Sequence, residues 1–188
     1  MPHLQRSIVL VGLMGAGKTS VGRRLAARLG VALIDSDEEI VAAAGMSIPE
    51  IFETQGEAVF RDGERRVIAR LLAGPPAVIA TGGGAFMDAE VRAGIAAAGV
   101  SVWLKASLAT LWSRLKGKPG RPLLAGPTPR EALAELLAKR EPTYALADLT
   151  VESPAGGLHE AVADAILRAV AARDAGLPAA ERCLGQPR

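Results

Sequence analysis

Short runs of β-branched and aliphatic residues alternate along the chain with longer stretches in which apolar residues recur at helical spacing. The short runs predict five strands, at residues 8–11, 32–34, 77–80, 100–104 and 149–151. Strands that alternate with helices predict a parallel sheet covered by helices on both faces. The pattern therefore predicts a three-layer α/β fold with a mostly parallel, five-stranded sheet.

The longer stretches predict helices at residues 17–29, 36–44, 47–55, 57–72, 130–139 and 158–172. Their ends carry recognisable signals. Gly30 is placed to end the first helix, and Ser36 followed by Glu39 is typical of a capping box that opens the second. Gly56 separates the third helix from the fourth.

Two segments lack any such period. Residues 116–129 are rich in glycine and proline, which predicts a loop, and a loop of this length is usually either functional or disordered. Residues 174–188 mix glycine, proline, alanine and charge, which predicts a disordered tail after a folded domain spanning residues 1–173. Cys183 lies in this tail and is expected to be an exposed free thiol.

Composition narrows the class. A chain of 188 residues with 49% hydrophobic and 22% charged residues is globular, and its single cysteine excludes an internal disulfide. The formal net charge of +2 argues against a nucleic-acid partner, and no apolar run approaches the length of a membrane helix. We therefore expect a soluble, cytoplasmic monomer. His3 and His159, which lie far apart without ligand spacing, are interpreted as surface polar groups.

The segment 12–19, GLMGAGKT, fits the P-loop pattern G-x-x-x-x-G-K-[ST] and lies between a predicted strand and a predicted helix. Its glycines let backbone N–H groups point at phosphate oxygens, and the N-terminus of the following helix favours an anion. Lys18 would neutralise the β- and γ-phosphates, and the Thr19 hydroxyl would ligate Mg²⁺. The P-loop leaves the phosphoryl acceptor open.

Further candidate groups follow the next two predicted strands. Asp35 and Asp37 come at the carboxyl end of one, where open α/β sheets bind ligands, and three glycines at 82–84 follow the other. Consecutive glycines permit a close backbone approach to a ligand. Arg61 and Arg140, taken alone, could simply pair with glutamates on their own helices.

Taken together, these motifs resemble those of shikimate kinases over residues 8–159. The matching segments, in family order and spacing, are 12–19, 35–37, 51–52, 56–61, 82–84, 121–124 and 140–144. The P-loop alone is shared by many kinases, whereas the paired aspartates, the Phe-Arg segment and the triple glycine are specific. The resemblance implies a P-loop kinase fold that transfers the γ-phosphoryl group of ATP to the 3-hydroxyl of shikimate. The products would be shikimate 3-phosphate and ADP, in the route to chorismate and aromatic amino acids.

The resemblance also implies roles for residues. It assigns catalysis to Lys18, Asp37 and Arg121, the last in the loop at about residues 116–129, which is expected to be a mobile lid that closes over bound substrates. It assigns ATP binding to Met14, Gly15, Ala16, Gly17, Lys18, Thr19, Arg114 and Arg121, with the segment around Ser153 and Pro154 beside the adenine. It assigns shikimate binding to Asp37, Phe52, Phe60, Arg61, Gly82, Gly83, Gly84 and Arg140. One Mg²⁺ would be held by Thr19 and, through water, by Asp35.

Two alternatives remain at this point. A gluconate or nucleoside monophosphate kinase would share the P-loop but not the triple glycine or the Phe-Arg segment. A non-catalytic nucleotide-binding module would keep the fold while having lost catalytic groups, and Lys18, Asp37 and Arg121 are all present here. Release of ADP that depends on shikimate would distinguish a shikimate kinase from these two alternatives.

Overall fold

A central sheet of five strands organises the computed structural model, which describes residues 3–116 and 127–185. The strands are β1 (Ser7–Val11), β2 (Leu33–Asp35), β3 (Val78–Ala80), β4 (Gly99–Lys105) and β5 (Leu149–Glu152). Their order across the sheet is β2-β3-β1-β4-β5, and all four neighbouring pairs are parallel. Each predicted strand overlaps an observed one, so the predicted sheet is confirmed.

Helices follow the strands as a parallel sheet requires. They are α1 (Lys18–Leu29), α2 (Ser36–Ala44), α3 (Ile48–Leu72), α4 (Ala89–Ala98), α5 (Leu108–Leu115), α6 (Pro129–Tyr144) and α7 (His159–Ala175), with 3₁₀ turns η1 (Ala85–Met87) and η3 (Ala179–Glu181). The predicted break at Gly56 is present as a kink inside α3, where this glycine has φ 85° and ψ 169°. Helix α6 continues past its predicted end through Pro142 to Tyr144.

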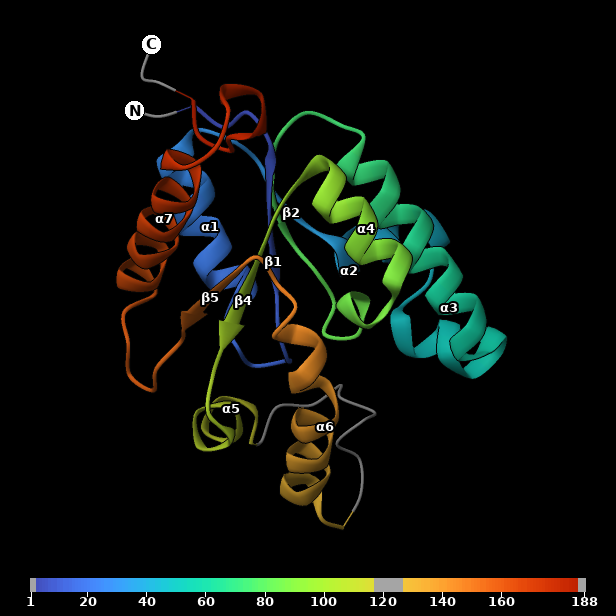
Figure 1. Cartoon of the computed structure of the whole chain (residues 1–188). Coiled ribbons are helices and arrows are strands. Elements are labelled where there is room, and N and C mark those ends of the chain that lie inside the picture. Colours follow the sequence, from blue (N-terminus) through green and yellow to red (C-terminus); the bar gives the residue numbers. More distant parts are fainter. Residues whose placement is uncertain (1–2, 117–126, 186–188) are drawn as a thin grey trace.

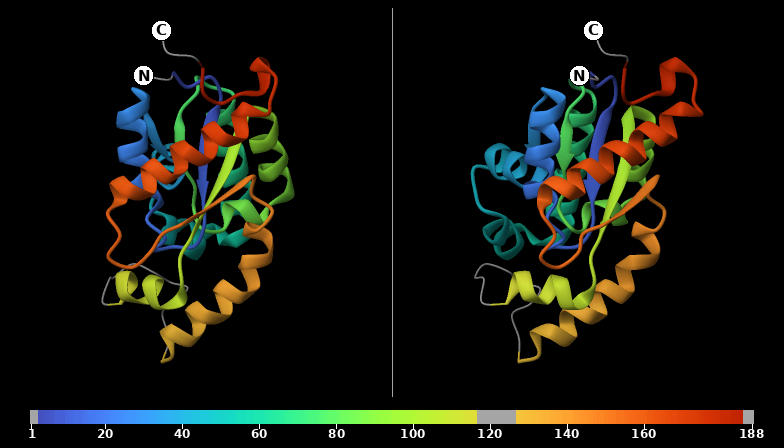
Figure 2. Two further views of the ribbon diagram at one scale, coloured as in Figure 1. Left: turned by 60° about the vertical axis from the view of Figure 1, so that its left-hand side comes forward. Right: turned by 90° about the vertical axis from the view of Figure 1, so that its left-hand side faces the viewer.

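The helices form two outer layers and a cap (Figure 1). Helices α1 and α7 pack together over one face of the sheet, and α3 and α4 pack together over the other. Helices α5 and α6 lie beyond the carboxyl ends of the strands in every view (Figure 2). Within the described ranges, no helix has the length and apolar character needed to span a membrane.

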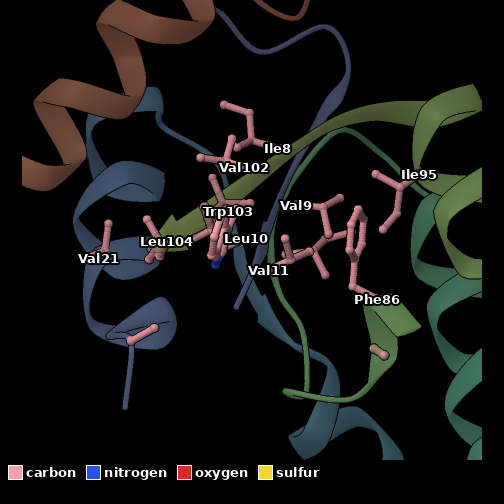
Figure 3. Close-up of a cluster of buried hydrophobic side chains, with 14 of the residues drawn as sticks. Ile8, Val9, Leu10, Val11, Val21, Phe86, Ile95, Val102, Trp103 and Leu104 are labelled. Carbon is pink, nitrogen blue, oxygen red and sulfur yellow. The ribbon is translucent and has the colours of Figure 1, made fainter. Parts of the chain in front are cut away.

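The hydrophobic core lies on both faces of β1, whose five residues are all buried. Ile8 and Leu10 point toward the α1 side of the sheet, whereas Val9 packs on the other side with Phe86 and Ile95 (Figure 3). A strand covered on both faces reads as a continuous apolar run, which is why β1 shows no polar alternation. The rigid β1 therefore ends in a fixed position, from which the P-loop starts.

The prediction of a disordered tail is wrong for residues 174–185. Helix α7 continues to Ala175, and the Asp174 carboxylate accepts hydrogen bonds from the N–H groups of Cys183 and Leu184, at 2.9 and 2.8 Å. Leu184 forms an antiparallel bridge with Leu4, and Cys183 is buried, so that burial raises the pKa of its thiol to about 11. The tail is ordered by Asp174 at the end of α7 and by Leu4 at the opposite end of the chain, and local composition reveals neither contact.

Candidate active site

The P-loop is the turn between β1 and α1. Gly12, Gly15 and Gly17 all have positive φ, and Gly17 is the N-cap of α1. A side chain at Gly12 would lie 2.9 Å from the Leu104 carbonyl oxygen, so the loop requires glycine there. The Lys18 ammonium donates to the carbonyl oxygens of Gly12 and Leu13, at 2.7 and 3.1 Å, and so lies across the mouth of its own loop.

The end of β2 differs from the sequence prediction. Asp35, not Ser36, caps α2, because its carboxylate accepts the N–H of Asp37 at 3.1 Å. The other Asp35 carboxylate oxygen accepts the Thr19 hydroxyl at 2.8 Å, which joins this strand end to the P-loop. Ser36 is buried and its hydroxyl accepts the N–H of Gly82 at 3.1 Å. The serine therefore fixes the triple-glycine segment rather than the helix start.

A half-buried carboxylate, Asp37, and a buried one, Glu64, face Gly82. A side chain at this position would lie 2.6 Å from Asp37 Oδ1 and 3.0 Å from Glu64 Oε1, so it would displace the Asp37 carboxylate. Burial, with the neighbouring Asp35, raises the pKa of Asp37, although Lys18 and Arg61 oppose the shift. Burial likewise raises the pKa of Glu64, against the opposing effect of Arg61.

Sequence reasoning missed Glu64, although a signal was available. It occupies the apolar side of its helix, one turn after Phe60 and one turn before Val67 and Ile68, where a charge is out of place. Glu64 is 2% exposed, and among the described residues its Oε1 is the buried side-chain oxygen that lacks a hydrogen-bond partner. A buried oxygen of this kind is expected to meet a ligand or an ordered water.

Arg61 is held by two glutamates of α3. Its Nη1 lies 2.6 Å from Glu64 Oε2 and its Nε lies 3.3 Å from Glu57 Oε1, so the simple helical pairing with Glu57 is present but is not the shorter contact. The guanidinium also lies 5.0 Å from the centre of the Phe60 ring. Phe60 and Phe52 pack at 4.7 Å between ring centres and supply the apolar wall beside it.

Arg140 comes from α6, on the far side of the triple glycine. Its Nη1 donates to the Gly83 carbonyl oxygen at 3.1 Å. Arg140 therefore contacts the triple glycine, and not Glu135 or Glu141, with which its position in the sequence would allow it to pair. Arg61 is also close to this segment, since a side chain at Gly84 would lie 2.6 Å from Arg61 Nη1. Helices α3 and α6 thus each bring one arginine to residues 82–84.

These groups line two adjoining cavities. The P-loop cavity, of about 420 Å³, is lined by polar groups that include Lys18, Thr19 and Asp35. The α3 cavity, of about 480 Å³, is mostly apolar and is lined by the predicted acceptor residues Asp37, Phe52, Phe60, Arg61, Gly82, Gly83, Gly84 and Arg140, together with Glu64. Met14, Asp37, Gly82 and Gly83 line both cavities. Two ligands bound in these cavities would therefore meet at the same few residues.

Arg114 closes the P-loop cavity on its other side. Its guanidinium donates to the carbonyl oxygens of Gly15 and Pro154, at 3.1 and 2.8 Å, and to the Ser153 hydroxyl at 3.1 Å. Ala16, a predicted ATP-binding residue of the P-loop, has a buried methyl group, and its carbonyl oxygen accepts the Ser153 hydroxyl at 2.8 Å. The structure therefore places Arg114 at the cavity, and the binding role of Ala16 stays a prediction.

His159 is a cavity residue that the sequence interpretation placed on the surface. It is half-buried at the start of α7 and lines the P-loop cavity, where a side chain at Gly17 would lie 3.8 Å from its Nε2. Burial, together with the charges of Arg24 and Arg114, lowers its pKa. The imidazole is therefore neutral near pH 7.

The predicted metal ligands fit a hard cation. The Thr19 hydroxyl and Asp35 carboxylate are oxygen donors beside the phosphate loop, and Mg²⁺ is usually bound by one or two such groups plus substrate phosphates and waters. In the part of the chain described, no group of three or more His, Cys, Asp or Glu side chains could hold a metal ion. Arg121 and most of the predicted lid, residues 117–126, lie outside the described residues, and their roles remain predictions.

Comparison with known proteins identifies what this architecture is similar to. Residues 14–171 match the family model for shikimate kinase. The chain is 60% identical over 151 residues to the shikimate kinase of Paramagnetospirillum magneticum, covering 80% of this chain and 77% of that protein. It is 55% identical over 170 residues to that of Ruegeria pomeroyi, covering 90% and 87%. Among solved structures, the Acinetobacter baumannii shikimate kinase in complex with shikimate has a TM-score of 0.85 at 39% identity, covering 89% of this chain and 94% of that one.

Proposed function

The chain belongs to the shikimate kinase family, and from this premise we propose how its own residues transfer the γ-phosphoryl group of ATP to the 3-hydroxyl of shikimate. Shikimate occupies the α3 cavity and the triphosphate occupies the P-loop cavity. The two cavities share Asp37 and Gly83, so that the acceptor hydroxyl and the γ-phosphate meet there. This junction is the observation that carries the proposal.

The nucleotide side works by charge and positioning. Backbone N–H groups of the P-loop and the N-terminus of α1 bind the phosphates, and Lys18 exchanges its loop carbonyls for β- and γ-phosphate oxygens. Arg114 and the segment at Ser153 and Pro154 border the nucleoside. Phosphoryl transfer requires little covalent chemistry from the protein, and for this reason the fixed cations matter most.

The acceptor side recognises a small carboxylate with hydroxyl groups. Arg61 and Arg140 lie on opposite sides of the triple glycine, and planar guanidinium groups suit a carboxylate better than lysine does. Phe52 and Phe60 cover the apolar part of the ring. Asp37, ionised, accepts a hydrogen bond from the attacking 3-hydroxyl.

The reaction is an in-line displacement. The shikimate oxygen forms its bond to the γ-phosphorus as the bond from that phosphorus to the ADP oxygen breaks, and the hydroxyl proton passes to Asp37 late in the step. Thr19, and Asp35 through water, would hold Mg²⁺, which would neutralise phosphate charge. Arg121, carried by the lid, would add a further cation while the lid excludes water.

Glu64 has a supporting part in this scheme. Its Oε2 holds Arg61 at 2.6 Å in the orientation that faces the α3 cavity, and its unpartnered Oε1 is available to a substrate hydroxyl or a water. We propose a monomer as the working unit. Light scattering during size-exclusion chromatography tests that state.

Release of ADP in a coupled assay tests the proposed function. Mg-ATP is supplied with shikimate, gluconate or a nucleoside monophosphate in parallel reactions. Turnover that depends on shikimate, with the other two acceptors inactive, is the expected result. Turnover with another acceptor alone would mean that Asp37, Arg61 and Arg140 are assigned to the wrong ligand. Nucleotide binding without turnover on any acceptor would favour a non-catalytic module.

A further inference from the structure

The triple glycine at residues 82–84 poses a conformational problem. Glycine has no preference that would select one backbone orientation, and three in succession can reorient their peptide planes at little steric cost. Gly82 and Gly83 line both cavities, and Gly84 lines the α3 cavity. The orientation of their peptide planes therefore decides whether a ligand there contacts N–H groups or carbonyl oxygens. Groups outside the segment must therefore fix it.

The first peptide of the segment is fixed by Ser36, whose hydroxyl accepts the Gly82 N–H. The carbonyl of the middle glycine, Gly83, is held from α6 by two donors. Arg140 Nη1 donates to it at 3.1 Å, and the Tyr144 hydroxyl donates to the same oxygen through a short hydrogen bond. Residues four positions apart share one face of a helix, so α6 brings both donors to one atom.

Tyr144 is well suited to fix an atom in place. It is fully buried, and its ring stacks on Trp103 of β4 at 5.9 Å between ring centres. Burial raises the pKa of Tyr144 to about 12, so its hydroxyl keeps the proton that it donates at any pH used for an assay. Arg140, by contrast, is half-buried on a flexible side chain and has a carboxylate to bind in the proposed function.

We propose that Tyr144 is a positioning residue that locks the peptide between Gly83 and Gly84. No cis peptide is present among the described residues, so the Gly84 N–H lies on the opposite edge of the plane whose carbonyl Tyr144 holds. The lock keeps that N–H turned away from α6 and supports the Gly83 carbonyl without Arg140. Arg140 is thereby free to leave this oxygen for the substrate carboxylate. The inference rests on the proposed function, because it assigns the segment to shikimate.

Tyr144→Phe removes one oxygen and keeps the ring and its stacking on Trp103. The Gly83 carbonyl then has only Arg140 as a described donor, so binding of the substrate carboxylate by Arg140 leaves a half-buried acceptor without either of its described donors. We expect the KM for shikimate to rise on the order of tenfold, with the KM for ATP within about twofold of wild type. Titration calorimetry with shikimate should show the same loss.

Ile166→Val is the matched control for stability. Ile166 is fully buried in α7, away from α6, and loss of its methylene lowers Tm without touching either cavity. If Ile166→Val lowers Tm by an amount comparable to Tyr144→Phe, both KM values of Ile166→Val should still equal those of the wild type. Equal increases of both KM values in Tyr144→Phe, or no change in either, would overturn the inference. Wild-type turnover of shikimate in the same assay tests the proposed function separately.

A second measurement needs no variant. Tyr144 is the sole tyrosine of the chain, so growth on 3-fluorotyrosine labels this position alone. The ¹⁹F resonance should shift as shikimate is added and saturate with the dissociation constant found by calorimetry. A resonance that stays unchanged at saturating shikimate would show that Tyr144 does not sense the acceptor site, and the inference would fail.

Discussion

The two cavities are built in opposite ways. The phosphate-binding part of the P-loop cavity is built on eight consecutive residues, 12–19, whose glycines have positive φ at three positions, although residues from other elements also line the cavity. The α3 cavity depends on side chains that come from α2, α3 and α6 and converge on residues 82–84. A phosphate can be bound by a local backbone motif, whereas recognition of one particular acceptor requires groups that only the folded sheet brings together.

Their electrostatics differ as well. In the P-loop cavity the cation Lys18 contacts neutral carbonyl oxygens that it can exchange for phosphate. In the α3 cavity Arg61 is paired to the buried Glu64, and Asp37 lies against the same glycine as Glu64. Changes in the first cavity should therefore reduce the rate of transfer or the binding of the nucleotide, and changes in the second should reduce acceptor binding and also disturb the fold.

Lys18→Ala should give the largest effect. We expect kcat to fall roughly a thousandfold, because a cation directed at the transferring phosphate is lost, while calorimetry with shikimate shows unchanged affinity. Lys139→Ala, which removes an exposed lysine of α6, serves as the matched control and should keep wild-type kcat. Loss of shikimate affinity in Lys18→Ala would break the separation between the two cavities.

Arg61→Ala should weaken shikimate binding by about 2–4 kcal/mol, since half of a carboxylate clamp is removed. It should also lower stability, because Glu64 is left buried without its cation. Adding Glu64→Gln to Arg61→Ala should restore Tm but not shikimate affinity. Arg66→Ala, on the exposed side of the same helix, is the control and should alter neither. Recovery of affinity in the double variant would remove Arg61 from the clamp.

We expect kcat/KM for shikimate to fall at low pH as Asp37 becomes protonated, which gives the pH profile an acid limb. The pKa of Asp37 is raised above the ordinary 3.8 by burial and Asp35, so protonation begins at a higher pH than for an exposed aspartate. Because the ionised form accepts the hydroxyl, kcat/KM should fall up to about tenfold per pH unit below that pKa. Binding of Mg-ADP, measured by calorimetry over the same range, should not show this limb. Its persistence in the residual activity of Asp37→Asn would assign it to another group.

The difference in construction also explains what the sequence could predict. The strands, the P-loop and the kink at Gly56 follow from local patterns, and the structure has them where they were expected. The roles of Arg61 and Arg140 were predicted from the resemblance to shikimate kinases, because the local sequence around each arginine predicts only an ion pair with a nearby glutamate. The Asp35 cap could not be predicted because it depends on local backbone geometry. The bridge between the tail and Leu4 and the shared contacts at Gly83 could not be predicted because they join residues that are distant in sequence.

His159→Ala should give the smallest effect and tests whether the P-loop cavity extends beyond its backbone motif. The imidazole lines the cavity beside Gly17, and its lowered pKa leaves it neutral near pH 7, so it offers a hydrogen bond but no charge to the nucleotide. We expect the KM for ATP to rise about threefold, with kcat and the KM for shikimate unchanged. His3→Ala is the control, because His3 lies near the N-terminus, where its carbonyl oxygen accepts the N–H of Gly185. If the KM for ATP is the same in both variants, the nucleotide is bound without His159.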